Sequence, residues 1–146
     1  MSLMNAMNVN ASGMSAQRLR MDVISSNIAN VNTTRDENGE VYRRKMVIFQ
    51  EKNADSFDSI LQGKRNNTGL RGVKVTEIAE DFETPLTMVY DPSHPDADDE
   101  GYVAKPNINT VTEMTNLISA TRAYEANVTA FNATKSMAMK ALEIGR

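Results

Sequence analysis

The chain's only histidine, His94, is the first residue to consider for chemistry. It lies between two prolines in Asp91-Pro-Ser-His-Pro95 and directly follows Ser93. A serine and a histidine within hydrogen-bond reach can act as nucleophile and base. Nothing in the sequence supplies a third group to orient such a pair, and a single histidine in a loop is usually solvated. We therefore predict no catalytic residue and no enzymatic activity.

The acidic run Asp96-Ala-Asp-Asp-Glu100, followed by Gly101, resembles part of a calcium-binding loop. It lacks the bidentate glutamate that closes such a loop, and no suitable helices flank it. The chain has no cysteine, so it has neither a thiolate metal site nor a disulfide framework. No glycine-rich phosphate loop is present. We expect a solvated acidic loop, no metal and no cofactor.

Length and composition limit the remaining classes of protein. The 146 residues make about one domain, and only 5% of them are aromatic, with no tryptophan. A net charge of −3 gives no electrostatic case for nucleic acid. No apolar run approaches the ~20 residues of a membrane span. The N-terminus lacks the basic patch and apolar stretch of a secretory signal, so we expect cytoplasmic residence or export without cleavage.

Charge is distributed unevenly along the chain. Residues 1–34 carry three charged side chains and residues 106–146 carry seven, whereas residues 35–105 carry twenty-five. A helix exposed to water normally has a charged outer face. Both ends read as helices, yet they are rich in Asn, Ser, Thr, Ala and Met instead. We therefore expect other copies or partners to surround these helices.

The N-terminal helix follows a heptad pattern that predicts a coiled-coil-like seam. The helix should end near residues 30–34, and residues 36–39 should form a turn. Two seam positions are polar, which indicates either an imperfect pattern or a buried amide that fixes register. The seam positions are Leu3, Met7, Asn10, Met14, Gln17, Met21, Ile24, Ile28 and Val31.

The C-terminal helix is predicted over residues 110–144. Pro106 precedes it, Thr110-Val-Thr-Glu113 fits a capping box, and Gly145 lies where a helix would stop. A helix this long favours a coiled coil, although an ordinary two-helix core is the alternative. Its seam consists of Met114, Leu117, Thr121, Tyr124, Val128, Phe131, Lys135, Ala138 and Leu142, widened by Ile118.

The middle of the chain is predicted to be β-rich. Residues 41–49, 72–78 and 86–90 have strand patterns, and a loop or short helix is expected near 51–67. The predicted fold class is α+β, mainly α, with the two terminal helices packed as an antiparallel coiled-coil-like pair. The predicted divisions are an N-terminal helix at 1–34, a small β-rich domain at 35–105 and a C-terminal helix at 106–146.

Several segments resemble the flagellar rod and hook axial protein family. Residues 25–34, Ser-Ser-Asn-Ile-Ala-Asn-Val-Asn-Thr-Thr, are similar to its N-terminal signature. Residues 119–127 and 133–137 are similar to its C-terminal helix motif. The short middle, with Tyr42-Arg-Arg-Lys45 and residues 90–103, resembles the proximal-rod members. Residues 51–67 depart from the family pattern, being longer and more polar.

The resemblance implies a structural subunit of the proximal rod of the bacterial flagellar basal body. Such subunits polymerise through their terminal helices into a tubular drive shaft that transmits torque, houses the export channel and crosses the periplasm. Implied partners are further copies, other proximal and distal rod proteins, a membrane-ring/rod adaptor protein and the flagellar type III export apparatus. The subunits would be exported without a cleaved signal peptide.

The resemblance also implies which residues contact other subunits. We expect small and amide side chains of the N-terminal signature to permit close helix approach, and Arg122 with Glu125 to set subunit orientation. Asn27→Leu should preserve the helix but damage assembly. The predicted subunit interface comprises Met14, Met21, Ile24, Ser26, Asn27, Ile28, Ala29, Asn30, Leu117, Thr121, Arg122, Tyr124, Glu125, Asn127, Val128, Phe131 and Leu142.

Two alternatives remain open from the sequence. One is another proximal-rod subunit of the same family, against which residues 90–103 argue. The other is a secreted helical-hairpin protein that binds a partner without polymerising. A stable monomer or dimer at high concentration would indicate the second alternative.

Overall fold

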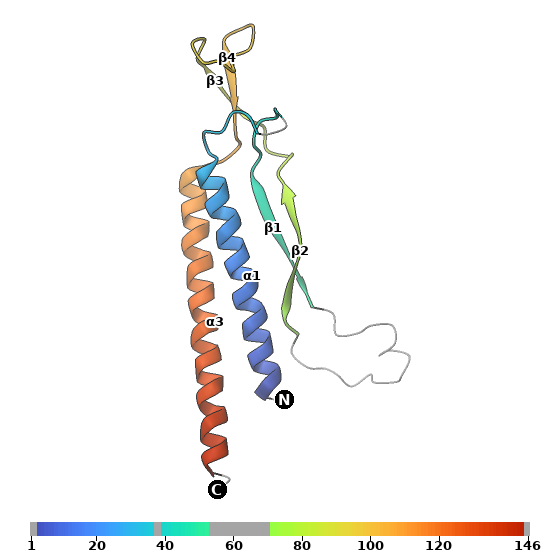
Figure 1. The fold of residues 1–146 in the computed structure, drawn as a ribbon, viewed down its shortest axis with the longest axis vertical. Helices are drawn as coiled ribbons and strands as arrows, with labels where there is room; N and C mark the ends of the chain where they lie inside the picture. The colour runs from blue at the N-terminus through green and yellow to red at the C-terminus, as the bar shows by residue number, and fades with distance from the viewer. Residues whose placement is uncertain (1–2, 37–38, 53–70, 145–146) are drawn as a thin grey trace, which may run out of the picture.

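Two long antiparallel helices dominate the computed structural model, which describes residues 3–36, 39–52 and 71–144 (Figure 1). The helices are α1 (Leu3–Ala29) and α3 (Thr110–Ile144). Four short strands lie between them in the chain. The predicted α+β class with a paired set of terminal helices is confirmed. Apart from its first two residues, the loop or short helix expected near 51–67 lies outside the described residues.

Helix α3 begins where the sequence predicted, but its cap differs from the prediction. The Asn109 side-chain oxygen accepts hydrogen bonds from the backbone N–H groups of Val111 (3.0 Å) and Thr112 (3.1 Å). Asn109 is therefore the N-cap, which satisfies donors that the first helical turn leaves free. The predicted capping box was wrong, because Glu113 lies one position too far along the helix and is turned inward. At 35 residues the helix is about 52 Å long.

Helix α1 ends close to the predicted boundary. The Asn30 side chain donates to the Ser26 carbonyl (2.9 Å), and Thr33 donates to the Asn30 side-chain oxygen (3.1 Å). These local bonds offer the backbone an alternative to continuing the helix. The expected turn follows, with the Gly39 amide donating to the Asp36 carbonyl (2.9 Å) and Gly39 at a φ of 83°.

The two helices approach closely because small residues lie between them. Ala16 and Ala120 are both buried. A Cβ added at Gly13 would lie 2.9 Å from the side-chain oxygen of Asn127, so this glycine and this amide face one another across the pair. Packing of this kind needs few large side chains, which agrees with the low aromatic content of the chain.

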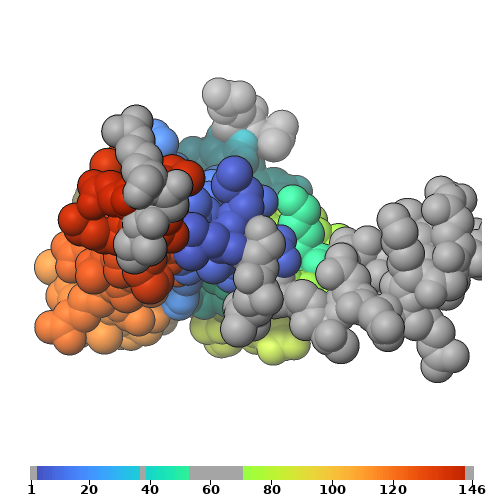
Figure 2. Space-filling model, turned by 90° about the horizontal axis from the view of Figure 1, so that it is seen from below, coloured from blue at the N-terminus to red at the C-terminus, as the bar shows by residue number. Residues whose placement is uncertain are grey.

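Strands β1 (Lys45–Glu51) and β2 (Val73–Glu80) form an antiparallel pair with an irregularity between Ile48 and Phe49. The pair packs along α1 on the side away from α3, so that α3, α1 and the strands lie in a row (Figures 1 and 2). The strand begins at Lys45 and not at residue 41, because the preceding residues join a polar cluster described below.

Strands β3 (Thr87–Tyr90) and β4 (Tyr102–Lys105) form a second antiparallel pair, which projects beyond the end of the helix pair (Figure 1). The sequence predicted three strands and missed β4, which is four residues long and follows the acidic loop. Gly101 precedes β4 with a φ of 85°, and a Cβ there would lie 3.0 Å from the Tyr90 ring. The position therefore requires glycine.

Candidate assembly interface

The side-chain amide of Asn27 bonds to β1 as the peptide group of a neighbouring strand would, and so links α1 to that strand. Its side-chain oxygen accepts from the Lys45 amide (2.9 Å), and its side-chain nitrogen donates to the Lys45 carbonyl (2.8 Å). The same nitrogen donates to Oε2 of Glu113 (3.1 Å), and the Tyr42 hydroxyl donates to the oxygen (3.2 Å). The residue is fully buried, so this one amide joins α1, β1 and α3.

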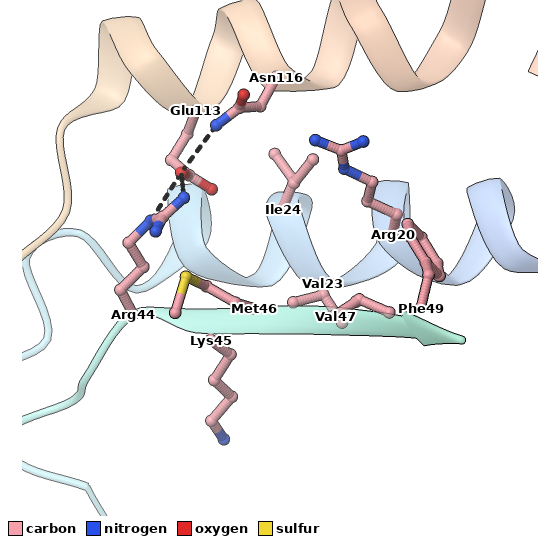
Figure 3. Close-up of a pocket in the computed structure, with 10 residues that line it drawn as sticks. All are labelled: Arg20, Val23, Ile24, Arg44, Lys45, Met46, Val47, Phe49, Glu113 and Asn116. Carbon is pink, nitrogen blue, oxygen red and sulfur yellow. Dashed lines mark hydrogen bonds and ion pairs between the residues drawn. The ribbon is translucent and has the colours of Figure 1, made fainter. Parts of the chain in front are cut away.

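Glu113 and Arg44 form the charged part of the same cluster (Figure 3). The Arg44 guanidinium donates to Oε1 of Glu113 through Nε (2.9 Å) and Nη2 (2.9 Å). The Glu113 side chain is 1% exposed and that of Arg44 is 24% exposed. A carboxylate so deeply buried requires paired donors, because an unpaired buried charge is strongly destabilising.

Asn107 and Asp81 extend this cluster toward the second strand pair. The Asn107 oxygen accepts from the Arg44 amide (2.9 Å), and its nitrogen donates to the carbonyls of Asp81 (3.0 Å) and Thr84 (3.1 Å). Bonds from the Thr84 amide and hydroxyl lower the pKa of Asp81, with smaller contributions from Glu83 and the Arg44 charge. We call Asn27, Arg44, Asp81, Asn107 and Glu113 the polar junction.

The acidic loop uses its carboxylates to hold its own turns. Asp96 is paired with the Arg35 guanidinium (2.6 Å) and accepts from the Thr34 hydroxyl (2.7 Å), which ties the loop to the segment after α1. The Ser93 hydroxyl donates to Asp91 (2.6 Å), and bonds from Ser93 lower the pKa of Asp91. His94 accepts from the Asp96 amide through Nδ1 (3.1 Å). Ser93 and His94 therefore have other partners than each other.

Within residues 3–36, 39–52 and 71–144, no group of His, Cys, Asp and Glu side chains is arranged to hold a metal ion. No helix in this part of the chain is long and apolar enough to cross a membrane.

The outer surface of α3 is apolar but uncovered. Val111, Met114 and Ile118, spaced as one face of a helix, are 74%, 54% and 55% exposed. Arg122 and Glu125 continue this face. In the described part of the chain, neither side chain has an ion pair or hydrogen bond. Exposed apolar faces of this kind are typical of surfaces that bind another protein.

The C-terminal end of α3 extends past α1. Gly13 faces Asn127 and Asn27 faces Glu113, so the same register places Leu3 opposite roughly residue 137. The remaining turns continue beyond the start of α1 in Figure 1. Met137, Met139 and Leu142 lie there and are 58%, 55% and 76% exposed.

The structure distributes the predicted interface residues over three environments. Ile24 and Asn27 are buried within the chain, and Asn27 bonds to Lys45 and Glu113. Partly buried are Met14, Met21, Ile28, Asn30, Leu117, Thr121, Tyr124, Asn127, Val128 and Phe131. Exposed are Ser26, Ala29, Arg122, Glu125 and Leu142. Their contacts with other subunits stay predictions.

Sequence reasoning missed most of the polar junction. Arg44 was noted only within a basic segment, Glu113 was interpreted as a cap, and Asp81 and Asn107 were not singled out. Glu113 is one of few acidic residues in the two helices, and that isolation is the one signal that could have marked it as buried and paired. The long-range partners have no signature in spacing.

The fold and these surfaces are consistent with one class of protein: a structural subunit built on a terminal helix pair with exposed apolar helix surfaces. Comparison with known proteins agrees. Residues 7–35 match the family described as flagella basal body rod protein. Residues 99–144 match the family described as flagellar basal body rod FlgEFG protein C-terminal.

Relatives match along the full length. The chain is 55% identical to the flagellar basal-body rod protein FlgC of Bacillus subtilis (strain 168), over 100% of both chains. It is 45% identical to FlgC of Borreliella burgdorferi, over 99% of this chain and 98% of the relative. Identity to FlgC of Escherichia coli O6:H1 is 39% over 100% of both. The chain belongs to the FlgC family of flagellar basal-body rod proteins and is a structural rod subunit.

Proposed function

We propose that this rod subunit polymerises through α1 and α3 into the tubular shaft that crosses the periplasm, transmits torque and encloses the export channel. Membership of the FlgC family implies the basal body and association with other rod components. The proposal of polymerisation through the helices rests on the exposed apolar face of α3, formed by Val111, Met114 and Ile118. Burial of this face against neighbouring helices would give a stiff wall, since close-packed interiors deform little.

The proposed rod core consists of residues 1–34 and 106–146, and residues 35–105 form a small β-rich domain outside this core, with β1 and β2 packed along α1. The direct neighbours would be further copies, proximal and distal rod subunits and a membrane-ring/rod adaptor protein. Delivery would be by the flagellar type III export apparatus, without cleavage. Low charge on both helices supports the core assignment, because burial of unpaired charge in an assembly is costly.

A matched pair of substitutions tests the proposal. Met114 on α3 and Met88 on β3 are 54% and 55% exposed, so neither contributes much to folding of the chain. Met114→Asp should abolish incorporation into basal bodies and motility, because it places a carboxylate in the proposed core. Met88→Asp should retain both. Circular dichroism of the purified variants should give the same helicity as the parent chain.

The result that would contradict the proposal is normal motility with Met114→Asp. Loss of motility with both variants would contradict the assignment of 35–105 to a domain outside the core, while leaving polymerisation through α3 standing. Loss with Met88→Asp alone would overturn both parts.

A further inference from the structure

A hollow of about 320 Å³ opens where α1, β1 and the start of α3 meet (Figure 3). Its apolar lining includes Val23 and Ile24 of α1 with Met46 and Phe49 of β1. Arg20 of α1 also lines it. The hollow has space for two or three side chains and is open on one side. It lies near the end of the helix pair that carries the strands.

The hollow has a positive charge without an acidic partner. Among the described residues, the Arg20 side chain forms no hydrogen bond or ion pair. Glu113 is the acidic residue of the lining, and Arg44 and Asn27 already neutralise its carboxylate. Lys45 points away from the hollow in Figure 3. An apolar side chain next to a carboxylate would therefore fit this lining best.

The extended end of α3 carries that combination. Met139, Leu142 and Glu143 have the i, i+3, i+4 spacing of one helix face. Leu142 is the most exposed large apolar side chain among the described residues, at 76%. Within the described residues the Glu143 carboxylate is paired only with Lys140 (2.8 Å), and both side chains are well exposed. Such a surface pair is weak and readily exchanged for another cation.

We propose that the end of α3 in one copy inserts into this hollow of a second copy. Leu142 and Met139 then contact the apolar lining, and the Glu143 carboxylate pairs with the Arg20 guanidinium. Within one chain the two surfaces cannot meet, because roughly 25 residues of helix, or about 37 Å, separate them. Two different surfaces at opposite ends give a head-to-tail contact, which can repeat from one copy to the next. The inference rests on the proposed function and adds a specific contact to it.

Engineered cysteines test this contact directly, since the chain has none of its own. The double variant Met46→Cys with Leu142→Cys, replacing the chromosomal copy in the native bacterium, is oxidised in isolated basal bodies with copper phenanthroline. A ladder of covalently linked copies is expected. Either single variant should give no ladder. Parent chain present in basal bodies but no ladder from the double variant would overturn the contact and leave the proposed function intact. Absence of the parent chain from basal bodies would overturn both.

If the cysteine variant fails to assemble, an exchange of charges tests the same contact between the end of α3 and the hollow. Arg20→Glu and Glu143→Arg should each abolish motility, and the double variant should recover it. Lys74→Glu is the control, because Lys74 is an exposed cation on β2, outside both the hollow and the proposed rod core, and should leave motility unchanged. Motility retained by both single variants, or no recovery in the double variant, would overturn the pairing.

Discussion

The polar junction and the outer face of α3 use opposite kinds of surface. At the junction, five polar side chains from α1, α3 and the connecting segments are bonded to one another or to nearby backbone groups and are largely removed from water. On the outer face of α3, apolar side chains remain exposed and neighbouring charges have no partner within the described chain. The same helix contributes to both, with Glu113 turned inward and Met114 turned outward.

This difference indicates which parts of the fold the single chain completes. Hydrogen bonds depend on fixed directions, so the junction sets where β1 and the second strand pair leave the helices. Apolar contacts lack such directions and can form later with another molecule. The polar contacts are therefore completed within the chain, whereas the apolar outer face of α3 is not covered by it.

The largest expected loss of stability comes from removing the buried carboxylate of the polar junction. Glu113→Ala leaves the Arg44 guanidinium and the Asn27 amide without their shared acceptor. Removal of one partner of a buried ion pair costs about 3 kcal/mol or more, so the free energy of unfolding should fall by about that amount. Urea unfolding followed by circular dichroism measures it. Glu125→Ala, on the exposed face of the same helix, should change it by less than about 0.5 kcal/mol. Equal losses in the two variants would contradict the comparison.

A somewhat smaller loss is expected from Asn27→Leu. The sequence predicted an intact helix and damaged assembly, and the structure adds a loss of stability within the chain. The substitution leaves the Lys45 N–H and C=O groups without partners, which costs about 2 kcal/mol. Hydrogen exchange of the Lys45 amide should accelerate. Asn30→Leu is the control, since Asn30 bonds only to α1 and the turn after it. Unchanged Lys45 exchange would contradict the peptide-like role of Asn27.

A pH titration sharpens the role of Asp81. Hydrogen bonds from Thr84 hold its folded pKa below the ordinary 3.8. A lowered folded pKa gives stability that is complete above pH 3.8 and is lost as pH falls through the folded value. Asp81→Asn should therefore reduce the dependence of unfolding free energy on pH below 3.8. Asp91→Asn provides a comparison, because hydrogen bonds from Ser93 lower the pKa of Asp91 in the acidic loop. An unaltered pH dependence in Asp81→Asn would contradict the assignment.

The helices could be predicted from sequence because their determinants are local. Periodicity, Pro106 before the helix and Gly145 after it predicted the observed bounds of α3, although the capping box used with them was wrong. Strand alternation located β2 within two residues. Each signal depends on neighbours within one or two turns. Strand β4 was missed because four residues after an acidic loop provide too short a pattern.

The polar junction could not be predicted, because its bonds join residues far apart in the chain. Asn27 and Glu113 are 86 positions apart, and Arg44 and Glu113 are 69 apart. No residue spacing encodes such pairs. The local sequence also fits Glu113 as a capping residue. The structure excludes that interpretation, because Asn109, one residue before the helix, is the N-cap.

The smallest effect on stability is expected at the end of α3, and it tests the helix register. Residues after about 137 have no α1 neighbour, so trypsin should cut the purified chain after Lys140 before it cuts after Arg122. Cleavage there should change the free energy of unfolding by less than about 0.5 kcal/mol, because in the described part of the chain the removed side chains pair only with Lys140 in the preceding turn. Mass spectrometry of early digestion products identifies the order. Earlier cleavage at Arg122 would mean that the helix pair itself is open in the monomer, and both helices would then fold only on assembly. Protection of the same Lys140 bond in isolated basal bodies would establish that a neighbouring subunit covers this end.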